Sequence, residues 1–416
     1  MSTNKKCPEV RFKDNCEKWQ FETLSEMVKP ISSYSLSRDV ETKDDTGYRY
    51  IHYGDIHRGR ISVIRSESEL PNIKKGDFQF LQKGDLVVAD VSEDYIGIAN
   101  ACVIDCEIND SIVAGLHTIA FRPVKLDSKF TYYMLHTKSF KDYGRVIGTG
   151  TKVFGITAKN FYNFEYAFPT VLEQINIGNF FQNLDQSITL HEKKLAQTQN
   201  LKKAMLEKMF PKAGSKQPEI RLKGFSGDWG VINLGSLCQI GDIDHRMPES
   251  AKSGIPYLMT GDFFGINGLD FENAKFISNE DYEHLAKKIK PEIGDILFAR
   301  YASVGTVRLV VTNIKFLISY SCAILKTSVN SIGEYLFFGF QTNFAQNQIE
   351  QEINTGSQRN IGIDSLKKLS INLPKENEQK AIGQFFKQLD ETLVLQQQQL
   401  QTLKNLKQAF LEKMFV

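Results

Sequence analysis

The sequence lacks the patterns that mark most enzymes, metal proteins and membrane proteins. Its 416 residues contain no CxxC pair, no HExxH, no GxSxG and no apolar run of 18 residues. The run Gly144–Lys152 has Thr149 where a phosphate-binding loop requires glycine, and the seven histidines are scattered without metal-ligand spacing. The Asn-Pro-Pro-aromatic and Asp-Pro-Pro-aromatic tetrapeptides of amino-methylating enzymes are also missing. We therefore predict no catalytic residues, no metal and no cofactor in this chain.

The sequence also has few cysteines and a small net charge. The six cysteines show no paired spacing, and no signal peptide precedes them, so we expect reduced thiols in a cytoplasmic protein without a membrane segment. Lysine and arginine number 51 against 49 acidic residues, a formal net charge of +2. A uniformly basic surface is excluded, and any nucleic-acid binding must rest on local basic patches.

What the sequence does contain is a long internal repeat. Residues Pro169–Phe210 return without a gap as Pro374–Phe415, and 20 of the 42 paired positions are identical. A weaker echo, in the same order, links residues 1–168 with 212–373; Lys83–Asp90, for example, matches Ile293–Arg300. The chain therefore reads as a duplication with diverged loops.

Each copy of the strong repeat predicts one long helix. A proline opens it, no further proline interrupts it, and apolar residues recur three and four positions apart, so each helix would be roughly 60 Å long. The matched polar residues His191 and Gln396 interrupt the apolar seams, as a register-fixing position does in a coiled coil. The predicted seams are Ile177, Phe181, Leu184, Ile188, His191, Leu195, Thr198, Leu201 and Met205 in the first copy, and Ile382, Phe386, Leu389, Leu393, Gln396, Leu400, Leu403, Leu406 and Phe410 in the second.

The order of these segments predicts an α+β architecture with four parts. They are residues 1–168, a first globule; 169–211, a first spacer helix; 212–373, a second globule; and 374–416, a second spacer helix. Short β-rich runs punctuated by Gly, Asp and Asn fill both globules. Since the first helix ends where the second globule begins and the second helix starts where that globule finishes, we expect the helices to pair antiparallel about a pseudo-twofold axis.

Two sets of residues are candidates for binding. Basic, polar and aromatic side chains near glycine-rich loops can reach DNA bases and phosphates. These are Lys43, Arg49, His57, Arg58, Arg60 and Lys152 in the first half, and Arg246, Arg300, Tyr301, Gln358 and Arg359 in the second. Apolar residues off the helix seams, namely Phe180, Leu190, Phe385 and Leu395, predict a docking surface for partner subunits.

These features together resemble the specificity subunit of type I restriction–modification systems. The resemblance spans the chain and is most specific in Pro374–Gln379, Thr355–Arg359 and Gly294–Arg300. It implies a subunit without catalysis, in which each globule is a target-recognition domain for one half of a split double-stranded DNA site. It also implies that the helices set the gap and bind two modification (methyltransferase) subunits, which carry S-adenosylmethionine and methylate adenine. Restriction (motor-nuclease) subunits would add cleavage.

Two other classes stay open at this point. One is a duplicated, non-catalytic protein-interaction adaptor, which the near-neutral net charge favours. The other is an enzyme whose site the sequence does not reveal. A steep fall of DNA affinity with salt would favour the DNA-reading class, because neutralised phosphates release counterions on binding.

Overall fold

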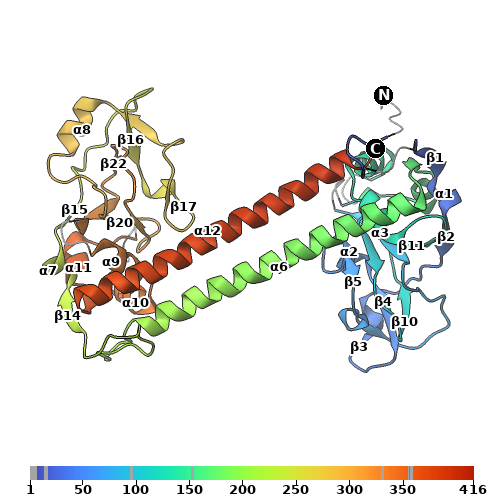
Figure 1. The fold of residues 1–416 in the computed structure, drawn as a ribbon, viewed down its shortest axis with the longest axis horizontal. Coiled ribbons are helices and arrows are strands. Elements are labelled where there is room, and N and C mark those ends of the chain that lie inside the picture. The colour runs from blue at the N-terminus through green and yellow to red at the C-terminus, as the bar shows by residue number, and fades with distance from the viewer. Residues whose placement is uncertain are drawn as a thin grey trace. The chain divides into compact units, whose positions relative to one another are not determined.

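The computed structural model describes residues 7–13, 17–93, 97–150, 154–328, 332–354, 356 and 359–416. The chain divides into two compact units, Met1–Glu192 with Gln399–Val416 (unit 1) and Lys193–Gln398 (unit 2). Each unit thus holds one globule and part of each long helix (Figure 1). The domain boundaries at residues 168, 211 and 373 follow the repeat instead, and they stay a prediction.

The globule of unit 1 is built on two main sheets. One has the strand order β2-β11-β7-β9-β5 and the other β10-β4-β6-β3, and short antiparallel pairs join β1 to β13 and β8 to β12. The strands of the first sheet are β2 (Val28–Ile31), β11 (Thr118–Pro123), β7 (Leu86–Ala89), β9 (Ala101–Ile104) and β5 (Val63–Ile64). The others are β10 (Ser111–Ala114), β4 (Tyr48–Ile51), β6 (Asn72–Ile73), β3 (Glu41–Thr42), β1 (Gln20–Thr23), β13 (Glu165–Phe168), β8 (Val91–Ser92) and β12 (Phe154–Gly155).

Unit 2 repeats this plan. Its sheet β15-β23-β20-β21 matches β2-β11-β7-β9, and its sheet β19-β16-β22 keeps the parallel pair that β4 and β10 form in unit 1. The pair β14 and β24 matches β1 and β13, and β17 pairs with β18. The strands are β15 (Ile240–Gly241), β23 (Cys322–Leu325), β20 (Ile296–Ala299), β21 (Val307–Leu309), β19 (Lys275–Ile277), β16 (Ile255–Leu258), β22 (Leu317–Ile318), β14 (Gly230–Asn233), β24 (Ser370–Leu373), β17 (Phe263–Phe264) and β18 (Gly268–Leu269).

Short helices complete both globules and confirm the α+β class. Unit 1 has α1 (Leu24–Met27), α2 (Tyr53–His57), α3 (Ser128–Met134), α4 (Lys138–Ile147) and α5 (Ala158–Tyr162). Unit 2 has α7 (Leu234–Leu237), α8 (Asn279–Leu285), α9 (Gly333–Gly339), α10 (Asn343–Gln351) and α11 (Ile363–Lys368). The 3-10 turns are Arg38–Val40, Glu67–Glu69 and Thr260–Asp262. Hydroxyl or carboxylate caps begin several of these helices; Asp127, for example, accepts from the Phe130 amide at 2.8 Å.

The two long helices form as predicted. They are α6 (Val171–Met209) and α12 (Glu376–Lys413), each beginning two residues after its proline. Bidentate ion pairs anchor their first turns. Arg11 donates to Glu173 at 2.8 and 2.7 Å in unit 1, and Arg221 donates to Glu378 at 2.7 and 2.8 Å in unit 2. Because Glu173 and Glu378 are buried, these pairs tie each helix to the segment that enters its globule.

The helices pair antiparallel in each unit. In unit 1, Lys407 contacts Asp185 at 2.6 Å and Lys404 contacts Glu192 at 2.7 Å, so residue numbers rise along α6 as they fall along α12. In unit 2, Lys202 contacts Asp390 at 2.6 Å. These lysines correct the predicted seams, because the neighbouring Leu201 and Leu406 are 47% and 43% exposed. The inward position has moved by one residue, to Lys202 and Lys407.

The last turn of each long helix completes the core of a globule. In unit 1, Leu411, Met414 and Phe415 of α12 and the residues after it join the core, and Phe415 stacks on Phe130 at 5.2 Å. In unit 2 the matching residues of the first repeat, Leu206, Met209 and Phe210, do the same, and Phe210 lies 5.4 Å from Tyr335. The shared Leu-Glu-Lys-Met-Phe ending is therefore core sequence in both units.

Candidate nucleic-acid interface

Three of the predicted DNA contacts in unit 1 lie together at the end of α2. Arg58 and Arg60 are exposed, and His57 lies with its Nδ1 3.4 Å from the Ser92 hydroxyl. Ser92 follows the carboxyl end of β7, two residues after Asp90. His57, Arg58 and Arg60 therefore form a short basic rim at the end of α2, next to the segment that follows the GDLVVAD run.

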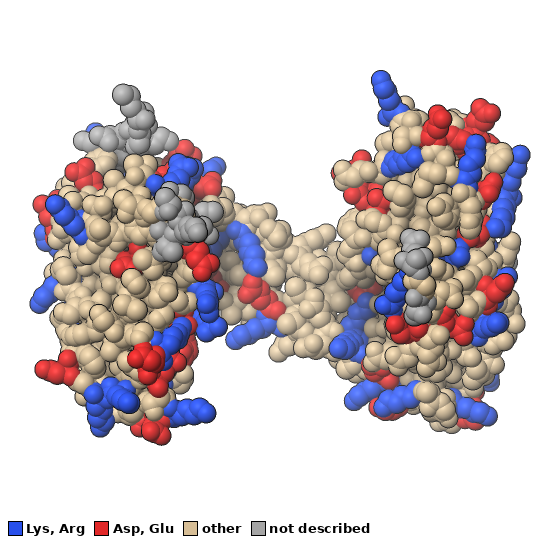
Figure 2. Space-filling model, turned by 180° about the vertical axis from the view of Figure 1, so that it is seen from behind, with Lys and Arg blue, Asp and Glu red and all other residues tan. Residues whose placement is uncertain are grey.

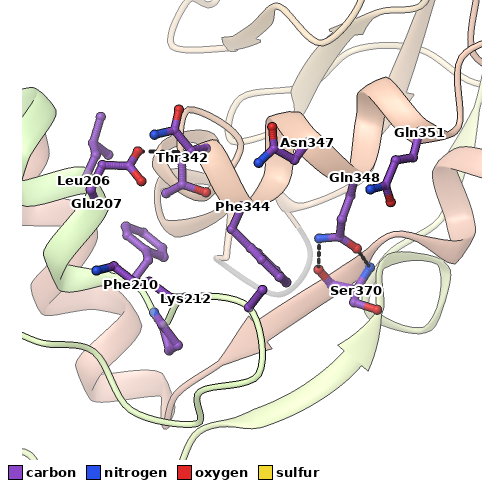
Figure 3. A pocket seen from close by; sticks show the side chains of 13 residues that line it. Leu206, Glu207, Phe210, Lys212, Thr342, Phe344, Asn347, Gln348, Gln351 and Ser370 are labelled. Atoms are coloured by element: carbon purple, nitrogen blue, oxygen red, sulfur yellow. Dashed lines mark hydrogen bonds between the residues drawn. The ribbon is translucent and has the colours of Figure 1, made fainter.

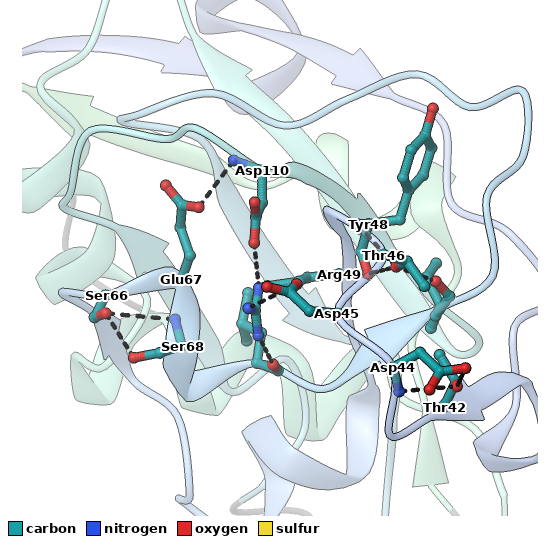
Figure 4. Close-up of polar contacts among 12 residues, drawn as sticks. Thr42, Asp44, Asp45, Thr46, Tyr48, Arg49, Ser66, Glu67, Ser68 and Asp110 are labelled. Carbon is teal, nitrogen blue, oxygen red and sulfur yellow. Dashed lines mark hydrogen bonds and ion pairs between the residues drawn. The ribbon is translucent and has the colours of Figure 1, made fainter.

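Arg49 belongs to a different environment. Figure 4 shows its guanidinium between Asp110 and Asp45, and it also donates to the Leu70 carbonyl at 2.8 Å. Its side chain is 13% exposed, so these contacts favour a structural role in joining β4 to the neighbouring loops. Lys43 is exposed next to this network, after β3. The predicted set in unit 1 thus divides between two places.

In unit 2, Arg300 is buried rather than exposed. Its Nη1 contacts Asp242 and its Nε donates to the Ile361 carbonyl at 3.0 Å. Asp242 also contacts Lys288 at 2.8 Å and His245 at 3.0 Å. Burial alone would raise the pKa of Asp242, but the hydrogen bonds from Lys288 and His245 and the charge of Arg300 lower it to about 2. The charge of Arg300 is therefore compensated by Asp242 of the same unit, which favours a structural role for Arg300.

The other predicted contacts of unit 2 lie nearer the surface. Tyr301 is half-buried, its ring lies 5.6 Å from the Arg300 guanidinium, and its backbone forms a bridge with Asn360. Arg359, which is 57% exposed, precedes that bridge and pairs with Glu350. Arg246 is 50% exposed and contacts Asp281 at 2.6 Å. Lys152 and Gln358 lie outside the described residues.

Asp90 and Arg300 occupy the same place in the two globules, as the repeat predicts. The Asp90 amide donates to the His117 carbonyl at 3.1 Å, and the Arg300 amide donates to the Ser321 carbonyl at 2.9 Å. The carbonyl of Asp90 accepts from Ile156 at 2.9 Å, and that of Arg300 accepts from Ile361 at 3.1 Å. The backbone framework is thus preserved while the side chains differ. Sequence reasoning missed His117 and Asp242, since each lies far along the chain from its partner.

Charges of both signs are interspersed on the face of each unit that Figure 2 shows. Figure 2 shows lysine and arginine interleaved with aspartate and glutamate on both units. This pattern agrees with the net charge of +2 and limits DNA contact to local groups such as the rim of Arg58 and Arg60.

The predicted docking residues separate into two kinds. Phe180 and Phe385 pack against the cores of their own units, and Phe180 lies 5.1 Å from Phe410. Leu190 and Leu395 are 65% and 54% exposed. Only the leucines present the apolar surface that a partner would cover.

A cavity of about 580 Å³ lies in unit 2 between the end of α6 and α10 (Figure 3). Its polar groups hydrogen-bond one another. The Glu207 carboxylate accepts from the Asn343 amide at 3.0 Å, and Gln348 exchanges two hydrogen bonds with the Ser370 backbone. The Glu207 contact joins the end of α6 to α10, and the Gln348 contacts join α10 to β24.

Comparison with known proteins decides the family. The model of the type I restriction modification DNA specificity domain matches residues 16–200 and again residues 226–405. The chain belongs to this family. It is a DNA specificity subunit with two recognition domains, and the two matches correspond to the two halves of the repeat.

Relatives of this specificity subunit align along its length. It is 21% identical over 411 residues to the putative type I restriction enzyme MjaX specificity subunit of Methanocaldococcus jannaschii, covering 94% of this chain and 91% of that one. It is 28% identical over 195 residues to the HindI specificity subunit of Haemophilus influenzae, covering 45% and 41%.

Solved structures share its fold. The crystal structure of a type I restriction–modification S subunit from M. genitalium has a TM-score of 0.60 at 16% identity, covering 99% of both chains. A structure from work on complex assembly and conformational transition of the type I system has a TM-score of 0.55 at 16% identity, covering 97% of this chain and 98% of that one.

The described residues contain neither a membrane-spanning helix nor a metal-ligand cluster. None of the helices found there combines the length and apolar character that crossing a membrane requires. Likewise, within the described ranges no group of three or more His, Cys, Asp or Glu residues is arranged to hold a metal ion.

Proposed function

We propose that this specificity subunit reads a split, asymmetric DNA site in the cytoplasm, with one half-site bound by each globule. It would have no catalysis of its own. Two methyltransferase subunits carrying S-adenosylmethionine would dock on the long helices and methylate adenine in each half-site, and restriction subunits would join through them. The helices α6 and α12 would set the gap between the half-sites.

One observation carries the proposal of two different half-sites. Asp90 and Arg300 have matching backbone hydrogen bonds, yet one is a partly exposed carboxylate and the other a buried, paired guanidinium. At matched places, the first globule therefore has a partly exposed acceptor where the second has a buried, paired cation, and base edges are read by exposed hydrogen-bonding groups. The exposed Leu190 and Leu395 support docking on the helices.

The test is co-expression with the candidate methyltransferase in a host without DNA methylation, followed by mapping of methylated adenines. We expect a bipartite motif with two unlike half-sites and a fixed gap. A continuous motif, or a palindrome, would contradict the proposal. The methyltransferase expressed without this chain is the control, and it should leave the motif unmethylated.

A protein-interaction adaptor is the alternative, favoured by the near-neutral charge. DNA affinity of the purified complex at 50 and 200 mM salt separates the two classes. A DNA reader that neutralises several phosphates loses at least about tenfold in affinity over this range, whereas an adaptor shows no such dependence.

A further inference from the structure

Asp90 and His117 form a contact at the edge of the main sheet of unit 1. Asp90 follows β7, His117 precedes β11, and the His117 Nδ1 lies 3.4 Å from the Asp90 Oδ1. The backbone of His117 has φ of 55°, a left-handed conformation that non-glycine residues seldom adopt. Such strain persists where the surroundings enforce it, and here it places the imidazole beside the carboxylate.

The surroundings of this pair are aromatic and basic. The Tyr53 ring meets His117 edge-on at 5.3 Å, and His52 lies 4.6 Å from Tyr53. At the other end of α2, His57 approaches Ser92, and Arg58 and Arg60 follow. The acidic group on this helix, Asp55, is held by Arg38 at 2.7 Å and by Arg60 at 3.5 Å. Asp90 therefore lies beside His117, which packs on the first turn of α2, and Arg58 and Arg60 follow the last turn of that helix.

Asp90 is less completely paired than its counterpart in unit 2. Its side chain is 30% exposed, whereas the Arg300 side chain is 7% exposed and is neutralised by Asp242. The Oδ1 atom of Asp90 is buried and has only the long, poorly aligned contact with His117. The exposed part of the Asp90 side chain therefore consists of its other atoms. Burial raises the pKa of Asp90, and His117 opposes that shift. A carboxylate that is partly exposed and has no well-aligned donor within the described part of unit 1 can accept a hydrogen bond from an outside group.

Base edges offer such a donor, and phosphates do not. A carboxylate repels phosphate and accepts hydrogen bonds only, so in the major groove it favours the amino groups of cytosine N4 and adenine N6 over the carbonyls of thymine and guanine. We propose that Asp90, positioned by His117, is a specificity-determining residue that accepts a hydrogen bond from the exocyclic amino group of one base in the first half-site. Arg58 and Arg60 would hold the flanking phosphates. This inference rests on the proposed reading of a split site.

The test compares base preference at each position of the first half-site. The full complex with its methyltransferase binds duplexes that carry the mapped site with single-base changes. Wild-type protein should prefer an amino-bearing base at one position by about fivefold or more, since a bidentate base contact gives about 5- to 150-fold and a single hydrogen bond falls at the lower end of that range. Asp90→Asn keeps the shape, but its amide can turn to donate or accept, and Asp90→Ala removes the group. Both should reduce that preference to less than about threefold at that position alone.

Further variants separate base reading from structural support. His117→Gly accepts the left-handed backbone and removes the imidazole, so it should weaken the preference at the same position. Asp142→Asn, at an exposed acidic residue of α4, should leave every preference unchanged. The second half-site should stay intact in all variants.

The outcomes are distinct. The inference is overturned if Asp90→Asn and Asp90→Ala both keep the wild-type preferences, or if they weaken binding equally at all positions. If wild-type protein shows no bipartite motif, the proposed function itself fails. Should Asp90→Ala not fold, the isosteric Asp90→Asn decides the result alone.

Discussion

Tyr133 and Phe338 differ by one hydroxyl at matched places, and exchanging them is a controlled test of the helix contacts. In unit 1 the Tyr133 hydroxyl donates to Asp185 at 2.8 Å, and Lys407 contacts the same carboxylate at 2.6 Å. In unit 2, Lys202 contacts Asp390 at 2.6 Å and lies 5.5 Å from the Phe338 ring. The phenylalanine supplies no second donor there.

The expected magnitudes follow from the exposure of these groups. A hydrogen bond to a charged group contributes about 1.5–3 kcal/mol when it is well buried. Asp185 and Lys407 are 22% and 29% exposed, so water recovers part of the loss. Tyr133→Phe should therefore destabilise unit 1 by about 1–2 kcal/mol. Phe338→Tyr adds a donor to a less exposed carboxylate, but the extra oxygen must fit a packed core, so we expect a gain of about 0.5–1.5 kcal/mol in unit 2.

The pH dependence of the stability of unit 2 gives a second test of the Phe338→Tyr prediction. Burial raises the pKa of Asp390 above its ordinary value of 3.8, and the hydrogen bond and charge of Lys202 oppose that shift. The folded state then holds the proton more tightly than the unfolded state, so the stability of unit 2 falls as pH rises from 3.8 through the raised pKa. A hydroxyl that donates to the carboxylate lowers this pKa. The gain from Phe338→Tyr should be small at the acidic end of this window and complete at pH 7.

Hydrogen exchange resolved by peptide is the suitable assay, because it assigns each change to one unit. Tyr133→Phe should speed exchange in α3 and the core of unit 1, and Phe338→Tyr should slow exchange in α9 and the core of unit 2. Each unit is the control for the other. The reasoning is refuted if Phe338→Tyr destabilises unit 2 at pH 7 while Tyr133→Phe leaves unit 1 unchanged.

Three further predictions concern the helices. Inserting one heptad after Lys194 and one after Gln399 lengthens each helix by about 10 Å and should lengthen the mapped gap without altering either half-site; an unchanged gap in an active complex would show that the helices do not set it. Residues 1–212 alone should form an antiparallel dimer that recognises an inverted repeat of the first half-site. The reason is that Leu206, Met209 and Phe210 of one copy can take the places of Leu411, Met414 and Phe415 in the core of the other. Light scattering that reports a folded monomer at tens of micromolar would reject this pairing. Glu378→Gln should destabilise unit 2 by about 3 kcal/mol in denaturant unfolding, because Arg221 loses its buried anionic partner. Glu376→Gln, at an exposed ion pair, is the control and should cost under about 0.5 kcal/mol. Equal effects of the two substitutions would show that the Arg221–Glu378 pair does not stabilise unit 2.

The long helices were predictable because their signals are local. Proline marks each start, and the apolar period needs no knowledge of distant residues. The prediction was wrong for the ends of the seams, where Leu201 and Leu406 are exposed. A lysine normally indicates a solvent-exposed position, and the acids Asp390 and Asp185 on the opposite helix are what make Lys202 and Lys407 inward residues.

The individual DNA contacts were harder to predict, because burial and pairing depend on residues distant in the chain. Arg300 resembles a loop contact in sequence, but its partner Asp242 lies 58 residues away, directly after β15. Arg49 is held by Asp110, 61 residues away. A basic residue beside a glycine-rich loop therefore predicts only that the residue lies near the binding edge. The acidic residues that pair with it can be identified only from the fold.

The duplication itself supplies a comparison that a single sequence otherwise lacks. Positions that are alike in both halves have structural contacts: Arg11 and Arg221 hold Glu173 and Glu378, and Gln174 and Gln379 donate to the carbonyls of the prolines that open the helices, at 2.9 and 2.7 Å. Asp85 and Asp295 likewise keep their places, with Arg122 in one unit and Lys326 in the other as the cation. At Asp90 and Arg300 the backbone is retained while the side chains differ, one partly exposed beside His117 and the other buried and paired with Asp242. Such positions are free to differ between two DNA-reading domains, and so they are where sequence specificity should be sought first.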